Sequence, residues 1–168
     1  MFSFKISNQI SNPYLKSGVE SILENADTKT IEENLRFLSF CNNKQDFENI
    51  EIFEELGGYA PTFGMLGALV GLIQVSVTSS DPKILLTGIA GAFIATLYGV
   101  ASANLVFLPI AKKMKNKLDE KLLEEEIIIN SVIDIAQEQS SIIISEKIDK
   151  MLLKNGYSKK GKIHYFVA

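Results

Sequence analysis

Charged residues are absent from two long segments in the middle of the chain. No Asp, Glu, Lys or Arg occurs from Gly57 to Ser80, or from Ile84 to Ala111. With a rise of about 1.5 Å per residue, these segments reach roughly 36 and 42 Å as helices, more than the roughly 30 Å of a bilayer's hydrocarbon. A soluble helix of that length carries a charged face, and neither segment has one. The pattern predicts a transmembrane helical hairpin.

The N-terminal flank has the pattern of two helices. Asn12-Pro13 predicts a helix start, because Asn is a favoured cap and Pro suits the first helical position. The segment Thr30-Ile31-Glu32-Glu33 has the spacing of a capping box and predicts the start of a second helix. Gly57-Gly58 is expected to interrupt that helix, and Ala60-Pro61 to restart it with the proline in the first turn.

The C-terminal flank opens with a lysine cluster, made up of Lys112, Lys113, Lys115, Lys117 and Lys121. By the positive-inside rule this end is cytoplasmic, so two spans place both flanks in the cytoplasm and leave residues 79–83 as the outer turn. An apolar stripe after the lysines predicts a helix with Glu124-Glu125-Glu126 on its polar side. A shorter amphipathic helix is expected from Ile142 to Leu153, ended by Asn155-Gly156.

These patterns predict an all-α membrane protein: a two-span transmembrane helical hairpin with cytoplasmic helices on both flanks. Residues 1–56 form a cytoplasmic helical segment. Residues 57–111 form the hairpin, with spans at about 59–78 and 84–108. Residues 112–168 form cytoplasmic amphipathic helices and a basic tail.

Composition excludes several other classes of protein. The net charge of −3 gives no basic face for nucleic acid. Met1 to Ser11 is too polar for the core of a signal peptide, so the hairpin must supply the insertion signal. The only cysteine, Cys41, excludes an intrachain disulfide and is expected to be buried as a small apolar residue. The only histidine, His164, has no neighbouring metal ligands, and no nucleophile–base pair is recognisable, so neither an enzyme, a metal site nor a cofactor is expected.

Small residues recur along both spans at helical spacing, and we expect them to be helix-packing positions. They are Gly64, Gly67 and Gly71 in the first span, and Gly91, Ala95, Gly99 and Ala103 in the second. Apolar side chains gain little from association inside lipid, so small residues that let backbones approach closely favour contact between helices.

Neither span carries an ionisable side chain that could relay an ion across lipid. If the protein conducts ions, a partner must bring the carboxylate. Thr96, near mid-membrane, is the hydroxyl best placed to line such a path, and the alternative is that it bonds back to its own helix carbonyl.

The same residues resemble a known family, the flagellar motor stator A subunit of the MotA/PomA type, within the MotA/TolQ/ExbB proton channels. Four segments carry the resemblance, most densely between Gly58 and Lys113. They are Asn12–Gly18, Gly58–Ile73, Asp81-Pro82 followed by Gly88–Val100, and Ala103–Lys113.

The resemblance implies an ion channel in the bacterial inner membrane that applies torque to a rotor protein of the FliG type. Copies of the A subunit would form a ring around the helices of a MotB/PomB-type B subunit, whose aspartate carries the ion. The family's functional prolines would fall on Pro61 and Pro109, and its pore threonine on Thr96. Sodium-driven members carry a further threonine where this chain has Ala68, which favours H⁺ over Na⁺.

The resemblance covers only the C-terminal half of such subunits, which have four spans. The sequence therefore suggests a truncated subunit or half of a split one. A TolQ/ExbB-type energy-transducing channel, and a non-conducting membrane remnant that only oligomerises, remain alternatives. The segments Thr96–Gly99 and Phe107–Pro109 resemble the motor type more closely.

Overall fold

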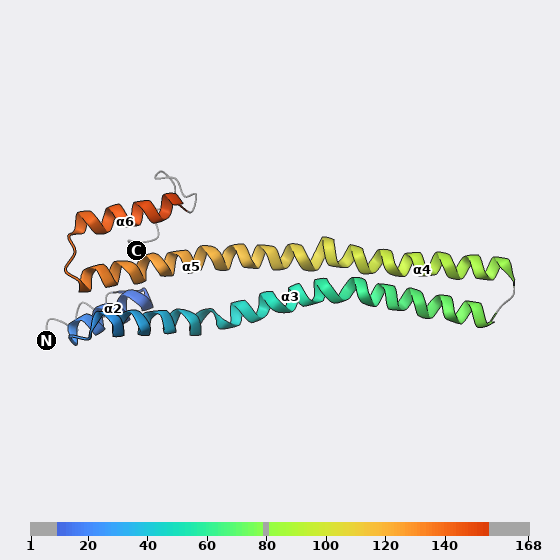
Figure 1. Cartoon of the computed structure of the whole chain (residues 1–168), viewed down its shortest axis with the longest axis horizontal. Helices are drawn as coiled ribbons and strands as arrows, with labels where there is room; N and C mark the ends of the chain where they lie inside the picture. Colours follow the sequence, from blue (N-terminus) through green and yellow to red (C-terminus); the bar gives the residue numbers. More distant parts are fainter. Residues whose placement is uncertain (1–9, 79–80, 155–168) are drawn as a thin grey trace. The chain divides into compact units, whose positions relative to one another are not determined.

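The computed structural model describes residues 10–78 and 81–154, and all regular structure within them is helical. The elements are α2 (Pro13–Leu23), α3 (Thr28–Thr78), α4 (Pro82–Ser102), the π-helix η1 (Ala103–Phe107), α5 (Leu108–Ala136) and α6 (Ser141–Lys154). Figure 1 shows α4 running antiparallel beside the second half of α3. Two helical stretches, Thr28–Thr78 and Pro82–Ala136, are long and apolar enough to cross a membrane.

The chain forms two compact units. One consists of residues 43–119 and contains both apolar spans, and the other combines the residues up to Asn42 with those from Glu120 onward. This unit therefore extends beyond the charge-free segments, at the end of the hairpin that the predicted topology places in the cytoplasm. The division into residues 1–56, 57–111 and 112–168 stays a prediction.

The start of α2 is as predicted, and the start of α3 is not. Asn12 Oδ1 accepts hydrogen bonds from the backbone N–H groups of Tyr14 (3.0 Å) and Leu15 (3.3 Å). Helix α3 already begins at Thr28, and the N–H of Ile31 donates to the carbonyl of Asp27 at 3.0 Å. The predicted capping box at Thr30 is therefore wrong, because Thr30 lies inside the first turn.

Helix α3 passes through Gly57-Gly58 without a break, so the predicted interruption is also wrong. Glycine costs only about 1 kcal/mol in a helix interior, and close packing uses its missing side chain here. A Cβ built on Gly57 would lie 2.5 Å from Cδ2 of Leu108. Pro61 consequently lies inside α3 rather than in a first turn.

Helix α4 begins two residues before the start predicted for the second span. Helix α3 ends at Thr78, and α4 begins at Pro82, where Asp81 Oδ1 accepts from the N–H of Lys83 at 2.9 Å. Residues 79 and 80 lie outside the described residues. Asp81 and Pro82 form the capped start of α4, and the predicted outer turn at 79–83 stays a prediction.

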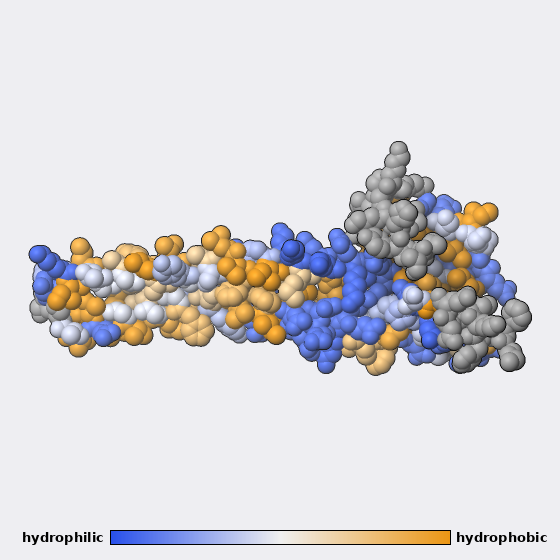
Figure 2. Space-filling model, turned by 180° about the vertical axis from the view of Figure 1, so that it is seen from behind, coloured by the Kyte–Doolittle hydropathy of each residue, from blue (hydrophilic) through white to orange (hydrophobic). Residues whose placement is uncertain are grey.

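The hairpin exposes its large apolar side chains. Phe63 and Phe93 are 68% and 72% exposed, and Ile73 and Leu97 are 64% and 65% exposed. Figure 2 shows a largely hydrophobic surface over the spans, which gives way to hydrophilic side chains at one end of them. A continuous surface of this kind is unfavourable in water and suited to lipid.

The second unit has a small core formed by α2, the start of α3 and the end of α5. Its buried residues are Tyr14, Ile31, Leu35, Ile128, Ile129 and Val132. Gly18 lets α2 approach α5 closely, because a Cβ built there would lie 2.5 Å from Cγ1 of Val132. Burial of these side chains is what holds the short helix α2 in place.

Two predictions about polar positions in the flanks are wrong. Glu125 is only 5% exposed, although its neighbours Glu124 and Glu126 are exposed as predicted. It occupies the packing face of α5, where its carboxylate accepts a hydrogen bond from Ser39 Oγ at 2.6 Å. Cys41 is exposed rather than buried, because it lies roughly 80–120° around α3 from the core residues Ile31 and Leu35.

Helix α6 agrees with the predicted helix to within one residue at each end. The turn before it contains Glu138 in the left-handed region at φ 57°. Lys147 Nζ contacts Asp134 Oδ1 at 2.6 Å and joins α6 to α5. The predicted stop at Asn155-Gly156 and the histidine His164 lie outside the described residues.

Candidate functional site

The two spans approach most closely at Gly64 of α3 and Gly99 of α4. A Cβ built on Gly64 would lie 2.9 Å from the carbonyl oxygen of Ala95 and 3.1 Å from the Cα of Gly99. A Cβ built on Gly99 would lie 2.7 Å from the carbonyl oxygen of Ala60. The two backbones are therefore in direct contact, with Cα–H groups facing carbonyl oxygens, a geometry typical of close helix pairs.

The remaining predicted packing residues differ in what they face. Ala103 is 1% exposed on the hairpin's inner side, and a Cβ on Gly67 would make an ordinary contact of 3.9 Å with the Cβ of Ala95. A Cβ on Gly71 or Gly91 would meet no described atom within 4 Å. The structure thus brings Gly64, Gly67, Ala95 and Gly99 together, and leaves Gly71 and Gly91 on open faces.

A further glycine contact lies toward the outer turn, at Gly88. A Cβ built there would lie 2.5 Å from Cγ2 of Val75. The side chain of Val75 on α3 fills the space beside Gly88 on α4. The outer half of the hairpin therefore packs a side chain against a glycine, and not backbone against backbone.

Thr96 lies beside the Gly64–Gly99 contact and bonds to its own helix. Its Cα would be 3.4 Å from a Cβ on Gly64, and its hydroxyl donates to the carbonyl of Ala92 at 3.2 Å. Ala68 and Ala92 are 9% and 8% exposed, so small buried side chains line this part of the hairpin.

Most other polar side chains in the spans also donate to their own helix backbone. They are Thr62, Ser76, Thr78, Thr87, Ser102 and Asn104. Such bonds satisfy the hydroxyl or amide donor inside lipid without a partner helix. No group of three or more His, Cys, Asp or Glu side chains that could hold a metal ion occurs in residues 10–78 and 81–154.

The two predicted functional prolines have different surroundings. Pro61 is half-buried inside α3, and Pro109 is exposed in the first turn of α5. Directly before Pro109 the chain widens into η1, where the N–H of Leu108 donates to the carbonyl of Ala103. Pro109 has no N–H for the carbonyl of Leu105, and a π-turn is one way for a helix to accommodate that loss.

The π-helix η1 was not predicted from the sequence. A proline far inside an apolar helical pattern is the signal that indicates such a distortion.

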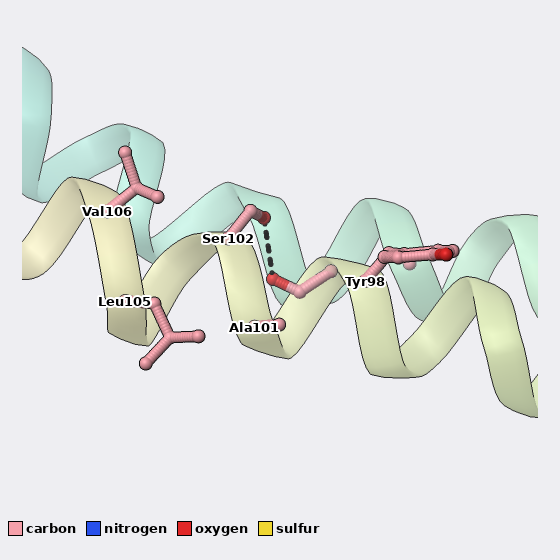
Figure 3. A pocket seen from close by; sticks show the side chains of 7 residues that line it. Tyr98, Ala101, Ser102, Leu105 and Val106 are labelled. Atoms are coloured by element: carbon pink, nitrogen blue, oxygen red, sulfur yellow. Dashed lines mark hydrogen bonds between the residues drawn. The ribbon is translucent and has the colours of Figure 1, made fainter.

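An open groove of about 550 Å³ lies on the hairpin next to the glycine contact. Its lining comprises Gly64, Tyr98, Gly99, Ala101, Ser102, Leu105 and Val106. Figure 3 shows Ser102 hydrogen-bonded to the backbone of α4, with Leu105 and Val106 one turn further on in η1. The groove is apolar apart from the hydroxyls of Tyr98 and Ser102.

A polar cluster in the other unit, of which Tyr14 and Glu125 are the buried members, joins α2, α3 and α5. Asn42 Nδ2 donates to the hydroxyl of Tyr14 at 3.1 Å, and Ser39 donates to Glu125. Burial raises the pKa of Tyr14 above its usual value, and Glu125 raises it further, whereas the hydrogen bond from Asn42 lowers it. The environment therefore holds Tyr14 neutral.

The sequence profile of the family described as the MotA/TolQ/ExbB proton channel family matches residues 6–126. The chain belongs to this family. The description of the family names a channel for protons and no enzyme activity. The predicted fold class, an all-α membrane protein, is confirmed.

Similar proteins of this family include flagellar motor subunits. The chain is 29% identical to the chemotaxis protein PomA of Vibrio alginolyticus over 154 residues, which is 92% of this chain and 58% of PomA. It matches a solved structure of C. jejuni MotAB with a TM-score of 0.77 and 25% identity, over 94% of this chain and 60% of that one.

The flagellar MotAB stator complex from Bacillus subtilis matches with a TM-score of 0.70 and 26% identity, over 88% of this chain and 60% of that one. This member of the MotA/TolQ/ExbB family thus spans about 60% of the length of the similar proteins. The resemblance to the MotA/PomA type is confirmed over that part.

Proposed function

We propose that this chain is an A-type component of a flagellar stator, in which ion flow through the membrane is converted into torque on the rotor. The observation that carries the proposal is a close-packed hairpin of the MotA/TolQ/ExbB family whose spans contain no Asp, Glu, Lys, Arg or His. Such a hairpin is suited to form the wall of an ion path but cannot relay the ion itself.

The carboxylate comes from a second protein in this proposal. A B subunit of the MotB/PomB type places an aspartate between copies of the chain, which surround it as a ring. The two similar solved structures are MotAB complexes, which supports such a partner.

The proposed site is the inner surface of the hairpin around Thr96. The hydroxyl of Thr96 donates to Ala92 in the isolated chain, and it exchanges this bond for contact with the ion path when the B subunit is present. Ala68 offers no oxygen ligand, so a desolvated Na⁺ would lack a partner there and H⁺ is the favoured ion.

Coupling to the rotor requires motion at the cytoplasmic ends of the spans. Pro61 inside α3 and Pro109 after η1 are the proposed hinge points, because each removes one backbone donor from a helix. Protonation of the partner's aspartate would shift the helices about these prolines and move a surface that contacts a FliG-type rotor protein.

The lysine cluster after Ala111 supports a location in the bacterial inner membrane with both flanks in the cytoplasm. In this topology the second unit, with the Tyr14 and Glu125 cluster, lies on the cytoplasmic side.

The test is deletion of the gene for this chain in its own host, followed by complementation with the wild-type gene. We expect cells that keep flagellar filaments but do not swim, and recovery with the wild-type chain. Normal swimming together with a leaky outer membrane, or with impaired uptake across it, would assign the chain to the TolQ/ExbB type instead. Normal phenotypes in all three assays would leave a membrane protein that only oligomerises.

A further inference from the structure

Two exposed rows of opposite charge flank the hairpin just beyond its apolar spans. We define the acidic row as Glu48, Glu51 and Glu55 of α3, and the basic row as Lys112, Lys113 and Lys117 of α5. We propose that the acidic row of one copy of this chain packs against the basic row of the next copy. This inference rests on the proposed ring of copies and identifies the surface through which neighbouring copies contact one another.

The acidic row lies on the side of α3 that faces away from α5. The buried positions of this part of α3 are Asn43, Ile50 and Gly57, and they define its packing side. At 100° per residue, Glu51 and Glu55 lie more than a quarter-turn from that side. Both are exposed.

The basic row has the corresponding position on α5. Ala111 and Leu118 are the buried residues there, at 2% and 5% exposure. At 100° per residue, Lys113 lies on the side of α5 opposite these two residues, and Lys112 and Lys117 lie a little more than a quarter-turn from them; all three are exposed. Each row therefore lies away from the packing side of its own helix.

Few of these charges are neutralised within the chain. Lys115 and Glu54, which belong to neither row, form an ion pair across the hairpin at 4.0 Å. In the acidic row, Glu48 pairs with Lys44 of its own helix at 3.7 Å. Within the described ranges, Glu51, Glu55 and the three lysines of the basic row have no ion-pair partner. The charges that remain are thus available to a neighbouring molecule.

The rows also lie at the same height relative to the spans. The contact of Gly57 with Leu108 and the pair of Glu54 with Lys115 bring the same levels of α3 and α5 together. Copies arranged around an axis normal to the membrane share that height. A head-to-tail contact then brings opposite charges together, whereas a two-fold contact would bring like charges together.

Anionic lipid headgroups are the alternative occupant of the basic row. They would leave the acidic row uncovered beside a negatively charged leaflet, whereas a second copy covers both rows. Charge complementarity therefore favours the copy.

The test uses two reversed versions of the full chain, each co-expressed with its partner subunit in membranes and each carrying two different tags. One version carries Glu51→Lys with Glu55→Lys, and the other carries Lys112→Glu with Lys113→Glu. We expect co-purification of each version with itself to fall at least about fivefold at low salt, since several exposed pairs are lost. The two versions should co-purify with one another, and all four changes in one chain should restore self-association.

A matched control for the glutamate reversals carries Glu33→Lys with Glu146→Lys, which changes the net charge in the same direction and by the same amount but lies outside both rows, and it should leave association unchanged. If the wild-type chain associates but the reversed versions behave like it, this inference is overturned and the ring is not. If only the lysine reversals act, and no partner version rescues them, the basic row serves lipid and the inference is again overturned. If wild-type copies do not co-purify, the proposed ring itself fails.

Discussion

Gly64 and Gly99 face one another so closely that neither position has room for a side chain. A Cβ on Gly64 would lie 3.1 Å from the Cα of Gly99, and a Cβ on Gly99 would lie 3.0 Å from the Cα of Gly64. The neighbours are backbone atoms, which cannot move aside as the end of a flexible side chain could. This contact fixes the distance between the two spans, and with it the position of Thr96.

We therefore expect Gly99→Ala to destabilise the hairpin. The added methyl group would lie 2.7 Å from the carbonyl oxygen of Ala60, and overpacking of this kind costs about 1–3 kcal/mol. Thermal unfolding of the full chain in detergent, followed by circular dichroism, measures the change. Gly91→Ala is the matched control, because its Cβ meets nothing within 4 Å. Equal unfolding temperatures for the two variants would contradict the packing.

Thr96→Val separates a pathway role from a structural one. Valine has nearly the same shape and removes only the hydroxyl, whose bond to the Ala92 carbonyl is worth about 0.5–1.5 kcal/mol. The fold should persist, and swimming speed in the complemented strain should fall several-fold. Thr87→Val removes an equivalent bond, to the carbonyl of Lys83 at 3.0 Å, and should swim normally. Wild-type swimming with Thr96→Val would remove Thr96 from the path.

The spans are the part of the fold that sequence predicts best. A charge inside lipid is so unfavourable that the charge-free segments alone locate α4 and the second half of α3. The same periodicity places glycines on stripes, but it does not say which stripe meets the partner helix. Gly64 and Gly99 are in contact while Gly71 and Gly91 are not, and only the rotation of each helix decides this.

The wrong predictions at Glu125 and Gly57 have a common physical origin. Glu125 sits at a core spacing on α5, and its burial depends on Ser39, which lies 86 residues away in the sequence. Likewise, Gly57 stays helical because Leu108, on another helix, fills the space beside it. Local pattern cannot supply either partner. The π-helix η1 is a different case, because Pro109, the residue that accounts for it, is only two residues further along the chain. This distortion could therefore have been predicted from the sequence.

Pro109→Ala should convert η1 toward a regular α-helix. The new N–H can donate to the carbonyl of Leu105, which removes a reason for the wider turn. We expect slower amide hydrogen exchange over residues 103–112 and loss of swimming, since the hinge becomes stiffer. Pro82→Ala is the control, because a proline at the start of α4 removes no helical bond. Unchanged exchange in Pro109→Ala would contradict the link between the proline and the π-turn.

Asp134→Asn should loosen α6. Asp134 is 7% exposed, and its Oδ1 contacts Lys147 Nζ at 2.6 Å; a hydrogen bond to a charged group contributes about 1.5–3 kcal/mol. Hydrogen exchange should become faster in α6 and stay unchanged in α5. Lys150→Ala is the comparison, because Lys150 pairs with Glu146 on its own helix at 2.8 Å. Equal effects of the two variants would show that the pair does not hold α6.

Alkaline pH should weaken the unit that contains Tyr14. Its folded-state pKa is raised above the usual 10.0, chiefly by burial, so the neutral phenol is favoured in the folded state. The stabilisation is complete below pH 10 and is lost as the pH rises through the folded pKa, because the unfolded chain ionises first. Tyr14→Phe should be less stable by about 1 kcal/mol near neutral pH, since the bond from Asn42 is lost. The variant should also have a smaller decline of unfolding free energy above pH 10, measured by urea titration of the full chain in detergent. A decline equal to that of the wild type would rule out Tyr14 as its source.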